Sequence, residues 1–281
     1  KRKDEMRKLI YSFFIMTAVL ASCSKEKLDQ KSIFDTDSPE RGAFDTWLLL
    51  NYVEPYNIQF NYKYIDRESD NNYNLVPAEY DKAVAMAKLT KYLWIDSYNE
   101  LLGDTFIKTY CPRMIQLIGS KAFNSQGSVV LGTAEGGLKI TLYNINGLNP
   151  SSPSIDFLNE WFFKTMHHEF AHILHQTKNY STDFNLISTD YQGPSWLNLE
   201  SDAVANKMGY VTCYASYSPD EDFVEIISNY VTHAKGYWES VLATAGEEGG
   251  DKLARKFEIV RNYLQESWGI DIDKLRDIVQ K

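Results

Sequence analysis

Nine residues, His-His-Glu-Phe-Ala-His-Ile-Leu-His at 167–175, constrain this chain most, because they hold four of its five histidines. Their central part, from His168 to His172, is an H-E-x-x-H motif. An α-helix turns once every ~3.6 residues, so positions i and i+4 lie on one face. His168 and His172 can therefore offer ring nitrogens to one Zn²⁺, with Glu169 placed to act on a water molecule.

The motif lies in a segment with the pattern of a long, largely buried helix. Asn149-Pro150-Ser151-Ser152-Pro153 breaks the chain, and Ser152 with a proline behind it is a typical helix start. The pattern predicts a helix over 154–177, with Trp161 and three of the histidines on one face and apolar residues on the others. Burial suits a metal site because ligands need rigid support.

A catalytic zinc site needs a third protein ligand and an open position for water. His175 is near in sequence, but at three residues from His172 it points past a metal held by the motif, so we expect it to support the site or to pack. The metzincin pattern requires Gly at 175 and His at 178. The chain has His175 and Lys178, so that pattern is absent.

Two acidic residues further along the chain are the other candidates for the third ligand. Glu200 lies at the start of a predicted helix near 200–208, where a carboxylate completes many zinc sites of the gluzincin kind. Glu221 follows Ser218 at capping-box spacing, so it could instead satisfy a helix N-terminus. The residues alone leave both candidates open.

Tyr214, Glu221 and Glu225 follow the motif helix at a spacing that resembles the zinc site of the anthrax-lethal-factor-like and Pro-Pro-endopeptidase-like metallopeptidases. There the first Glu is the third ligand, the Tyr assists catalysis and the second Glu supports the site. The resemblance implies one gluzincin-type Zn²⁺ ion. Its implied residues are the ligands His168, His172 and Glu221, the catalytic Glu169 and Tyr214, and the supporting Glu225 and His175.

The residues around the motif, together with 209–216 and 221–225, resemble more closely a family of putative zinc-binding metallopeptidase lipoproteins of gut bacteria. The resemblance covers about 155–235, and the first hundred residues after the signal carry no matching motif. It implies a zincin-like metallopeptidase domain. Such proteins are often found beside outer-membrane glycan-uptake systems, which implies such a system as a partner.

The order of predicted elements argues for an α+β fold, because strands and one helix come first and mostly helices follow. We expect a small mixed or antiparallel sheet, an active-site helix and a mainly helical C-terminal part. The strands are predicted at 47–53, 56–64, 105–118 and 129–145, the last with a turn at 134–137. Beyond the helices at 80–102 and 154–177, helices are predicted near 200–208, from 218, and at 234–246, 251–265 and 271–280.

The N-terminus has the pattern of an export signal. Basic residues precede a short apolar stretch, and Leu20-Ala21-Ser22-Cys23 resembles the bacterial lipobox, in which the Cys is lipidated. We therefore expect a lipoprotein signal peptide at 1–22, a lipidated Cys23 with a polar tether at 23–42, and a single domain at 43–281. The alternatives are a plain signal peptide or an N-terminal anchor helix. The expected location is the outer membrane, facing the cell surface or the periplasm.

Charge and cysteine content limit the partners. Residues 1–22 contain five basic and two acidic side chains, and the rest contains 24 basic and 36 acidic residues, a net charge of −12. Such a surface repels phosphate backbones, so nucleic acid is not an expected partner. Cys111 and Cys213 could pair in an exported protein or remain as free thiols.

These observations predict a membrane-tethered, zinc-dependent metallopeptidase acting on a peptide or protein. An extended substrate is expected to bind by β-addition along an edge strand at 138–143. The alternative is a surface glycan- or peptide-binding accessory lipoprotein with a non-catalytic zinc site, which an aromatic content of 14% would suit.

Overall fold

The computed structural model describes residues 40–281 except 124–128, 131 and 136, together with residues 3, 5 and 6. Contacts divide the chain into residues 1–41 and 42–281, and the elements that follow belong to residues 42–281. Cys23 and the lipobox lie outside the described residues. None of the helices formed by the described residues has both the length and the apolar character needed to span a bilayer.

Four strands form a mixed sheet in the order β1-β2-β6-β5. β1 (Gln59–Asn61), β2 (Met114–Leu117) and β6 (Lys139–Leu142) pair in parallel, and β5 (Gly132–Glu135) joins β6 in antiparallel. The central strands β2 and β6 are mostly buried, as strands covered on both faces are. A short hairpin pairs β3 (Ala122–Phe123) with β4 (Val129–Val130).

The prediction that 138–143 is an edge strand is wrong. β6 lies between β2 and β5, so both of its sides are hydrogen-bonded. Within the described residues, β5 is the strand at that edge, and it contacts the helix that carries the motif. The two strands on either side of the predicted turn are antiparallel, but Ala134 and Glu135 of the turn predicted at 134–137 belong to β5, and the strand at the edge is β5.

Helices of the first half cover the sheet. They are α2 (Ala43–Leu48), the π-helical turn η1 (Leu49–Val53), α3 (Glu54–Tyr56), α4 (Tyr80–Thr90), η3 (Lys91–Ile95), α5 (Asp96–Leu102) and α6 (Asp104–Tyr110), with 3₁₀ turns η2 (Asp66–Glu68) and η4 (Ile145–Gly147). The run from α4 to α5 is the helix predicted at 80–102, and it ends at Gly103 with φ of 79°.

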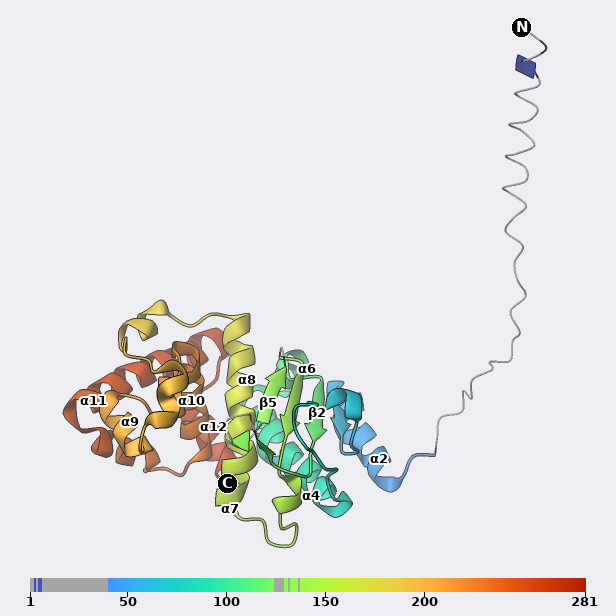
Figure 1. The fold of residues 1–281 in the computed structure, drawn as a ribbon, viewed down its shortest axis with the longest axis horizontal. Coiled ribbons are helices and arrows are strands. Elements are labelled where there is room, and N and C mark those ends of the chain that lie inside the picture. Colours follow the sequence, from blue (N-terminus) through green and yellow to red (C-terminus); the bar gives the residue numbers. More distant parts are fainter. Residues whose placement is uncertain (1–2, 4, 7–39, 124–128, 131, 136) are drawn as a thin grey trace. The chain divides into compact units, whose positions relative to one another are not determined.

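The second half is helical. It comprises α7 (Ile155–Leu158), η5 (Asn159–Phe163), α8 (Lys164–Thr177), η6 (Thr182–Leu186), η7 (Gly193–Asn198), α9 (Asp202–Met208), η8 (Tyr214–Ser216), α10 (Pro219–Thr232), α11 (Tyr237–Tyr263), η9 (Leu264–Trp268) and α12 (Ile272–Val279). α11 joins the two helices predicted at 234–246 and 251–265 across a kink at Gly246. In Figure 1, α8 runs between the sheet and the group formed by α9 to α12.

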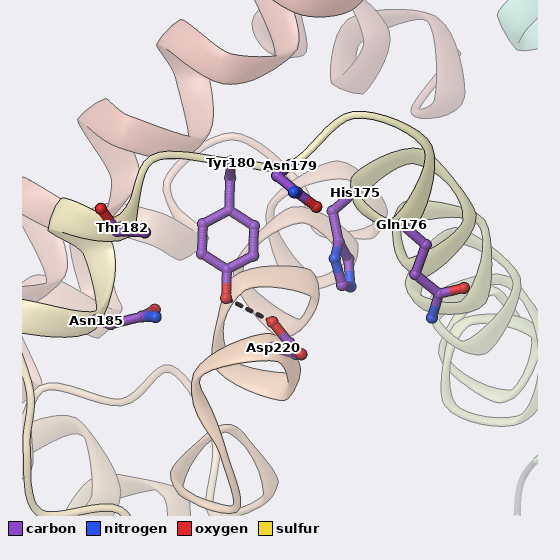
Figure 2. A pocket seen from close by; sticks show the side chains of 7 residues that line it. All are labelled: His175, Gln176, Asn179, Tyr180, Thr182, Asn185 and Asp220. Atoms are coloured by element: carbon purple, nitrogen blue, oxygen red, sulfur yellow. Dashed lines mark hydrogen bonds between the residues drawn. The ribbon is translucent and has the colours of Figure 1, made fainter.

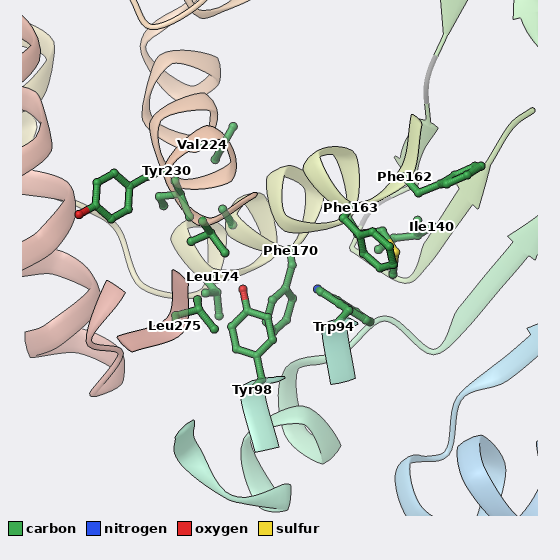
Figure 3. Packing of buried hydrophobic residues seen from close by; sticks show 14 of the residues in the cluster. Trp94, Tyr98, Ile140, Phe162, Phe163, Phe170, Leu174, Val224, Tyr230 and Leu275 are labelled. Atoms are coloured by element: carbon green, nitrogen blue, oxygen red, sulfur yellow. The ribbon is translucent and has the colours of Figure 1, made fainter. Parts of the chain in front are cut away.

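Phe170 of α8 lies at the centre of the core. Its ring meets those of Trp94 and Tyr98 edge-to-face, with centroids 5.5 Å and 5.0 Å apart. Figure 3 shows these rings together with Leu174 of α8 and Val224 of α10. The face of α8 opposite the histidine pair is therefore held by aromatic packing, which gives the motif a rigid support.

Two predicted strands are helices. Residues 47–53 lie in α2 and η1, and the first half of 105–118 forms α6. Both are short apolar or aromatic runs, whose periodicity does not separate a strand from a buried helix. Packing decides for α6, where Ile107 is buried and Phe106 stacks on Tyr98. The helix predicted from Ser152 begins at Ile155, with Ser154 as its N-cap.

Gly249 of α11 allows this helix to pack closely on α9. A Cβ at this position would lie 2.3 Å from the carbonyl oxygen of Asn206 and 2.7 Å from that of Lys207. We expect Gly249→Ala to lower the free energy of unfolding by about 1–3 kcal/mol, because backbone must move. At Gly250 the nearest such atom is 3.4 Å away, so Gly250→Ala should raise it by about 0.5–1 kcal/mol through helix propensity. Urea denaturation of both variants checks this pair, and equal effects would contradict it.

Candidate metal centre

Two packed helices bring the candidate ligands together. α8 contacts α10, and His168 and His172, one turn apart on α8, face the first turn of α10. α10 begins with Pro219 after Ser218, whose hydroxyl accepts a hydrogen bond from the backbone N–H of Glu221. The start of α10 is thus fixed by the capping residues that the sequence contains.

The donor atoms of His168, His172 and Glu221 form one cluster. Nε2 of His168 lies 3.0 Å from Oε2 of Glu221, and Nε2 of His172 lies 3.4 Å from the same oxygen. All three ligand atoms lie within 4.8 Å of one another. The Glu221 carboxylate thus faces the histidines, although its backbone N–H is bonded to the helix cap.

This geometry fits a metal ion. Ligand atoms about 2.0–2.1 Å from a tetrahedral Zn²⁺ lie roughly 3.3 Å from each other. The two nitrogen–oxygen distances of 3.0 Å and 3.4 Å are close to that value. Two imidazoles and one carboxylate also form a common donor set for catalytic zinc. His168, His172 and Glu221 could therefore hold one Zn²⁺ with a position left open.

Glu225, one turn after Glu221, is the buried partner of His168. Nδ1 of His168 donates to Oε1 of Glu225 over 2.9 Å, which directs Nε2 towards Glu221. The carboxylate is 2% exposed and has three further partners. These partners are Thr212 Oγ1 at 2.6 Å, Asn229 Nδ2 at 3.2 Å and Lys164 Nζ at 3.2 Å, all on Oε2. A fully paired carboxylate of this kind orients the histidine and makes it more basic.

His172 has a histidine instead of a carboxylate behind it. Its Nδ1 lies 2.9 Å from Nε2 of His175, which is 6% exposed. If Nε2 of His172 binds metal, Nδ1 must carry the proton, so Nε2 of His175 accepts it and the proton of His175 lies on Nδ1. Burial, followed by the charge of His172, lowers the pKa of His175, which favours the neutral acceptor.

Hydrogen bonds shift the pKa values of the clustered groups strongly. Burial alone would lower the pKa of His168, but its hydrogen bonds to Glu221 and Glu225 outweigh burial and raise the pKa to about 9. Burial alone would raise the pKa of Glu221, but its hydrogen bonds to His168 and His172 lower the pKa to about 2. The two imidazoles thus stabilise the negative charge of the Glu221 carboxylate. A cation bound between the three side chains would stabilise the same charge.

Glu169 and Tyr214 lie beside the donor atoms. Burial raises the pKa of Glu169, and among the described residues its carboxylate has no hydrogen-bond or ion-pair partner. The Tyr214 ring stacks on His168 with centroids 5.9 Å apart. Burial, then the charge of Glu221 and a hydrogen bond to it, raise the pKa of the Tyr214 phenol, so the hydroxyl keeps its proton as a donor.

Other candidates from the sequence lie elsewhere. Glu200 is exposed and outside the cluster. His167 is fully buried, with Nδ1 3.0 Å from the hydroxyl of Tyr98, and burial lowers its pKa to about 3, so it is a neutral core residue. Cys111 and Cys213, which could have paired, are both free thiols.

A polar pocket of about 450 Å³ opens behind His175. Figure 2 shows its lining, in which the Tyr180 hydroxyl donates to Oδ1 of Asp220 over 2.6 Å. The lining residues are His175, Gln176, Asn179, Tyr180, Thr182, Asn185 and Asp220. His175, which lines the pocket, is the hydrogen-bond partner of His172.

Sequence reasoning missed the partners of Glu225 and one aromatic neighbour. Lys164 lies four residues before His168 and Asn229 four residues after Glu225, so helical spacing could have found both. Thr212 gave no such signal. Trp196 lies in the short 3₁₀ turn η7 and meets the Tyr214 ring edge-to-face at 5.0 Å, and the sequence pattern there does not identify it.

Comparisons with known proteins identify the family of the chain. Residues 37–273 match the family described as putative zinc-binding metallo-peptidase. The chain belongs to this family. It is also similar to the crystal structure of a putative zinc-binding metallo-peptidase from Bacteroides caccae, with 44% sequence identity and a TM-score of 0.74 over 89% of this chain and 94% of that one. None of the curated proteins matches the chain. The family supports a zinc-binding hydrolase.

The choice between Glu221 and Glu200 as third ligand can be tested directly. We expect Glu221→Gln to weaken zinc binding by more than the ~10–100-fold that loss of an outer partner costs, because the cluster loses its only charged donor. Glu200→Gln, at an exposed position outside the cluster, should leave affinity unchanged. Competition with a chromogenic chelator measures both constants. A larger loss in Glu200→Gln would move the third ligand to Glu200.

Proposed function

We propose that this protein is a zinc-dependent metallopeptidase with a gluzincin-type site. The observation that carries the proposal is the cluster of His168 Nε2, His172 Nε2 and the Glu221 carboxylate, with an unpaired Glu169 beside it. The arrangement of a mixed sheet, a metal-bearing helix and a helical C-terminal part supports a zincin-like domain over residues 43–281. Membership of the metallo-peptidase family supports the same reaction class.

The proposed ligands are His168, His172 and Glu221. Zn²⁺ bound by them would supply Lewis acidity, which lowers the pKa of a water molecule towards neutrality and polarises the carbonyl group of the scissile bond. Glu225 and His175 hold the imidazole rings by their Nδ1 atoms and leave each Nε2 directed at the ligand cluster.

Glu169 is the proposed general base. Its carboxylate has no partner among the described residues, and burial raises its pKa, which makes it a stronger proton acceptor than an exposed carboxylate. It takes one proton from the attacking water and passes it to the nitrogen of the leaving amine. The water oxygen and its second proton then remain in the new carboxyl group, and the peptide bond breaks without any other reactant.

Tyr214 is the proposed oxyanion donor. Its hydroxyl keeps its proton because burial and the Glu221 carboxylate raise its pKa. It can therefore donate a hydrogen bond to the carbonyl oxygen as negative charge develops there. The hydrogen bond to Glu221 keeps the hydroxyl beside one of the proposed ligands, which supports this role.

An extended peptide is proposed to bind along β5. This strand pairs with β6 on one side, and within the described residues its other side has no strand partner. Gly132 brings β5 close to α8, since a Cβ there would lie 2.6 Å from Cγ2 of Thr165, one turn before Glu169. Backbone hydrogen bonds to β5 would hold a substrate next to α8, the helix that carries His168 and His172.

The N-terminal lipid remains part of the proposal on sequence grounds. The lipobox at Cys23 supports attachment to the outer membrane, with residues 23–42 as a tether. The expected partners are a peptide or protein substrate and, by family resemblance, a glycan-uptake system of the outer membrane.

Metal content and cleavage test the proposal together. The purified protein should contain close to one equivalent of zinc, and His168→Ala should contain less than about a tenth of that, because one ligand is lost. Glu169→Gln should keep zinc and the fold but lose about 10²–10⁴-fold in kcat on a cleaved peptide. Zinc binding without cleavage of any member of a broad peptide library would support the accessory binding protein instead.

Tyr214→Phe tests the oxyanion donor. The ring and its stacking remain, and only the hydroxyl is lost, so zinc content should not change. We expect kcat to fall by about 10²-fold or more, as when one oxyanion donor is removed. Tyr92→Phe, at a tyrosine that is 64% exposed, is the control. Equal kcat values for the two variants would assign Tyr214 to packing.

A further inference from the structure

The two histidines of the proposed metal site have different neighbours, His175 beside His172 and Tyr214 beside His168. His172 turns Nε2 towards Glu221 and Nδ1 towards His175, and the polar pocket of Figure 2 lies beyond His175. The hydrogen-bonded rings of His175 and His172 thus link the lining of that pocket to Glu221. The Tyr214 ring, by contrast, lies directly on His168. Because Tyr214 is the proposed oxyanion donor, a substrate that uses it must lie on the side of Tyr214.

Two aromatic side chains contact Tyr214 on that side, and an exposed leucine follows one of them in the chain. Trp196 meets Tyr214 edge-to-face at 5.0 Å, and Tyr217 lies against Tyr214 with centroids 6.1 Å apart. Leu197 adjoins Trp196 in the same 3₁₀ turn. Leu197 is 41% exposed and Tyr217 39%, and Trp196 is partly exposed. Trp196, Leu197 and Tyr217 are called the apolar ledge below.

Backbone hydrogen bonds hold the ledge in place. The N–H of Gln192 donates to the carbonyl of Ser216 over 2.7 Å, and the N–H of Gly193 donates to that of Tyr217 over 3.2 Å. These bonds join η7, which carries Trp196, to η8 and the residue after it. The ledge is thus formed before any ligand binds, which lowers the entropy lost on binding.

The ledge is neutral and retains unused hydrogen-bond donors. Trp196, Leu197 and Tyr217 carry no charge, and within the part of the chain that the structure describes neither the indole N–H of Trp196 nor the Tyr217 hydroxyl has a hydrogen bond. Aromatic rings with a free polar tip suit an apolar side chain attached to a polar backbone. Exposed apolar residues gathered at one place mark a binding surface more often than scattered ones do.

We propose that the apolar ledge binds a bulky apolar side chain of the peptide substrate, within one or two residues of the cleaved bond. The proposal rests on the proposed peptidase function. The substrate is the occupant because the ledge continues from Tyr214, which stacks on a proposed metal ligand. The substrate class is therefore peptides with an aromatic or long aliphatic residue beside the scissile bond.

Cleavage profiles of ledge variants test the proposal. The native protein should prefer Phe, Tyr, Trp, Leu or Met over Ala at one position near the cleaved bond. Trp196→Ala should reduce that preference by about 10–100-fold in kcat/KM, the range in which an apolar pocket discriminates. Trp196→Phe should keep most of the preference. Leu197→Asn should reduce it, and because Leu197 is exposed this change should not destabilise the fold. Ile155→Ala removes an apolar side chain that is 70% exposed on α7 and should change nothing.

A second measurement does not depend on turnover. Zinc-loaded Glu169→Gln protein should bind a peptide with a bulky apolar residue more tightly than its Ala analogue by calorimetry, and Trp196→Ala in that background should abolish the difference. An unchanged apolar preference in both Trp196→Ala and Leu197→Asn, or a native preference for charged residues, would overturn the ledge proposal. Trp196-dependent binding of an oligosaccharide without any peptide preference would overturn it as well. If the protein binds zinc and shows this peptide binding but cleaves no peptide, the proposed peptidase function is contradicted and the apolar ledge is still supported as a peptide-binding surface.

Discussion

The contact between α8 and α10 is the interaction on which the rest of the site depends, because it buries carboxylates among imidazoles. Taking the Glu225 carboxylate out of water costs several kcal/mol, and only close partners offset that. Four groups from α8, α10 and the segment before η8 supply them. Removing one partner from a buried pair costs about 3–5 kcal/mol. The two helices are thus held in one register by groups that also direct His168.

A second buried ion pair fixes the rotation of α10 from its other side. Nζ of Lys256 on α11 lies 2.6 Å from Oδ2 of Asp222, and both side chains are fully buried. The same ammonium donates to the carbonyl of Gly209, and the Tyr191 hydroxyl donates to Asp222. Asp222 follows Glu221 directly, about 100° around the helix. Because this pair anchors α10 to α11, Glu221 cannot turn away from the histidines without unpairing two buried charges.

The sequence predicts the site better than the fold, for a physical reason. Ligand spacing on a helix is a local property, so the motif helix and the capped start of α10 were found with their side chains on the faces that meet. The edge strand and α6 depend on non-local packing: β5 rather than β6 forms the edge, and residues 104–110 are helical because Ile107 is buried and Phe106 stacks on Tyr98. Thr212 reaches Glu225 only after folding, and no spacing rule predicts it.

The partner of His172 is a histidine, His175, and not a carboxylate, which the negative charge in the first turn of α10 explains. Asp220, Glu221 and Asp222 lie together in the first turn of α10, where the positive end of the helix dipole stabilises them. A fourth carboxylate behind His172 would repel them and would raise the cost of burial. A neutral imidazole accepts the same hydrogen bond without adding charge. His175 therefore orients one proposed ligand as Glu225 orients the other, without adding a charge to those of Glu221, Glu225 and Lys164.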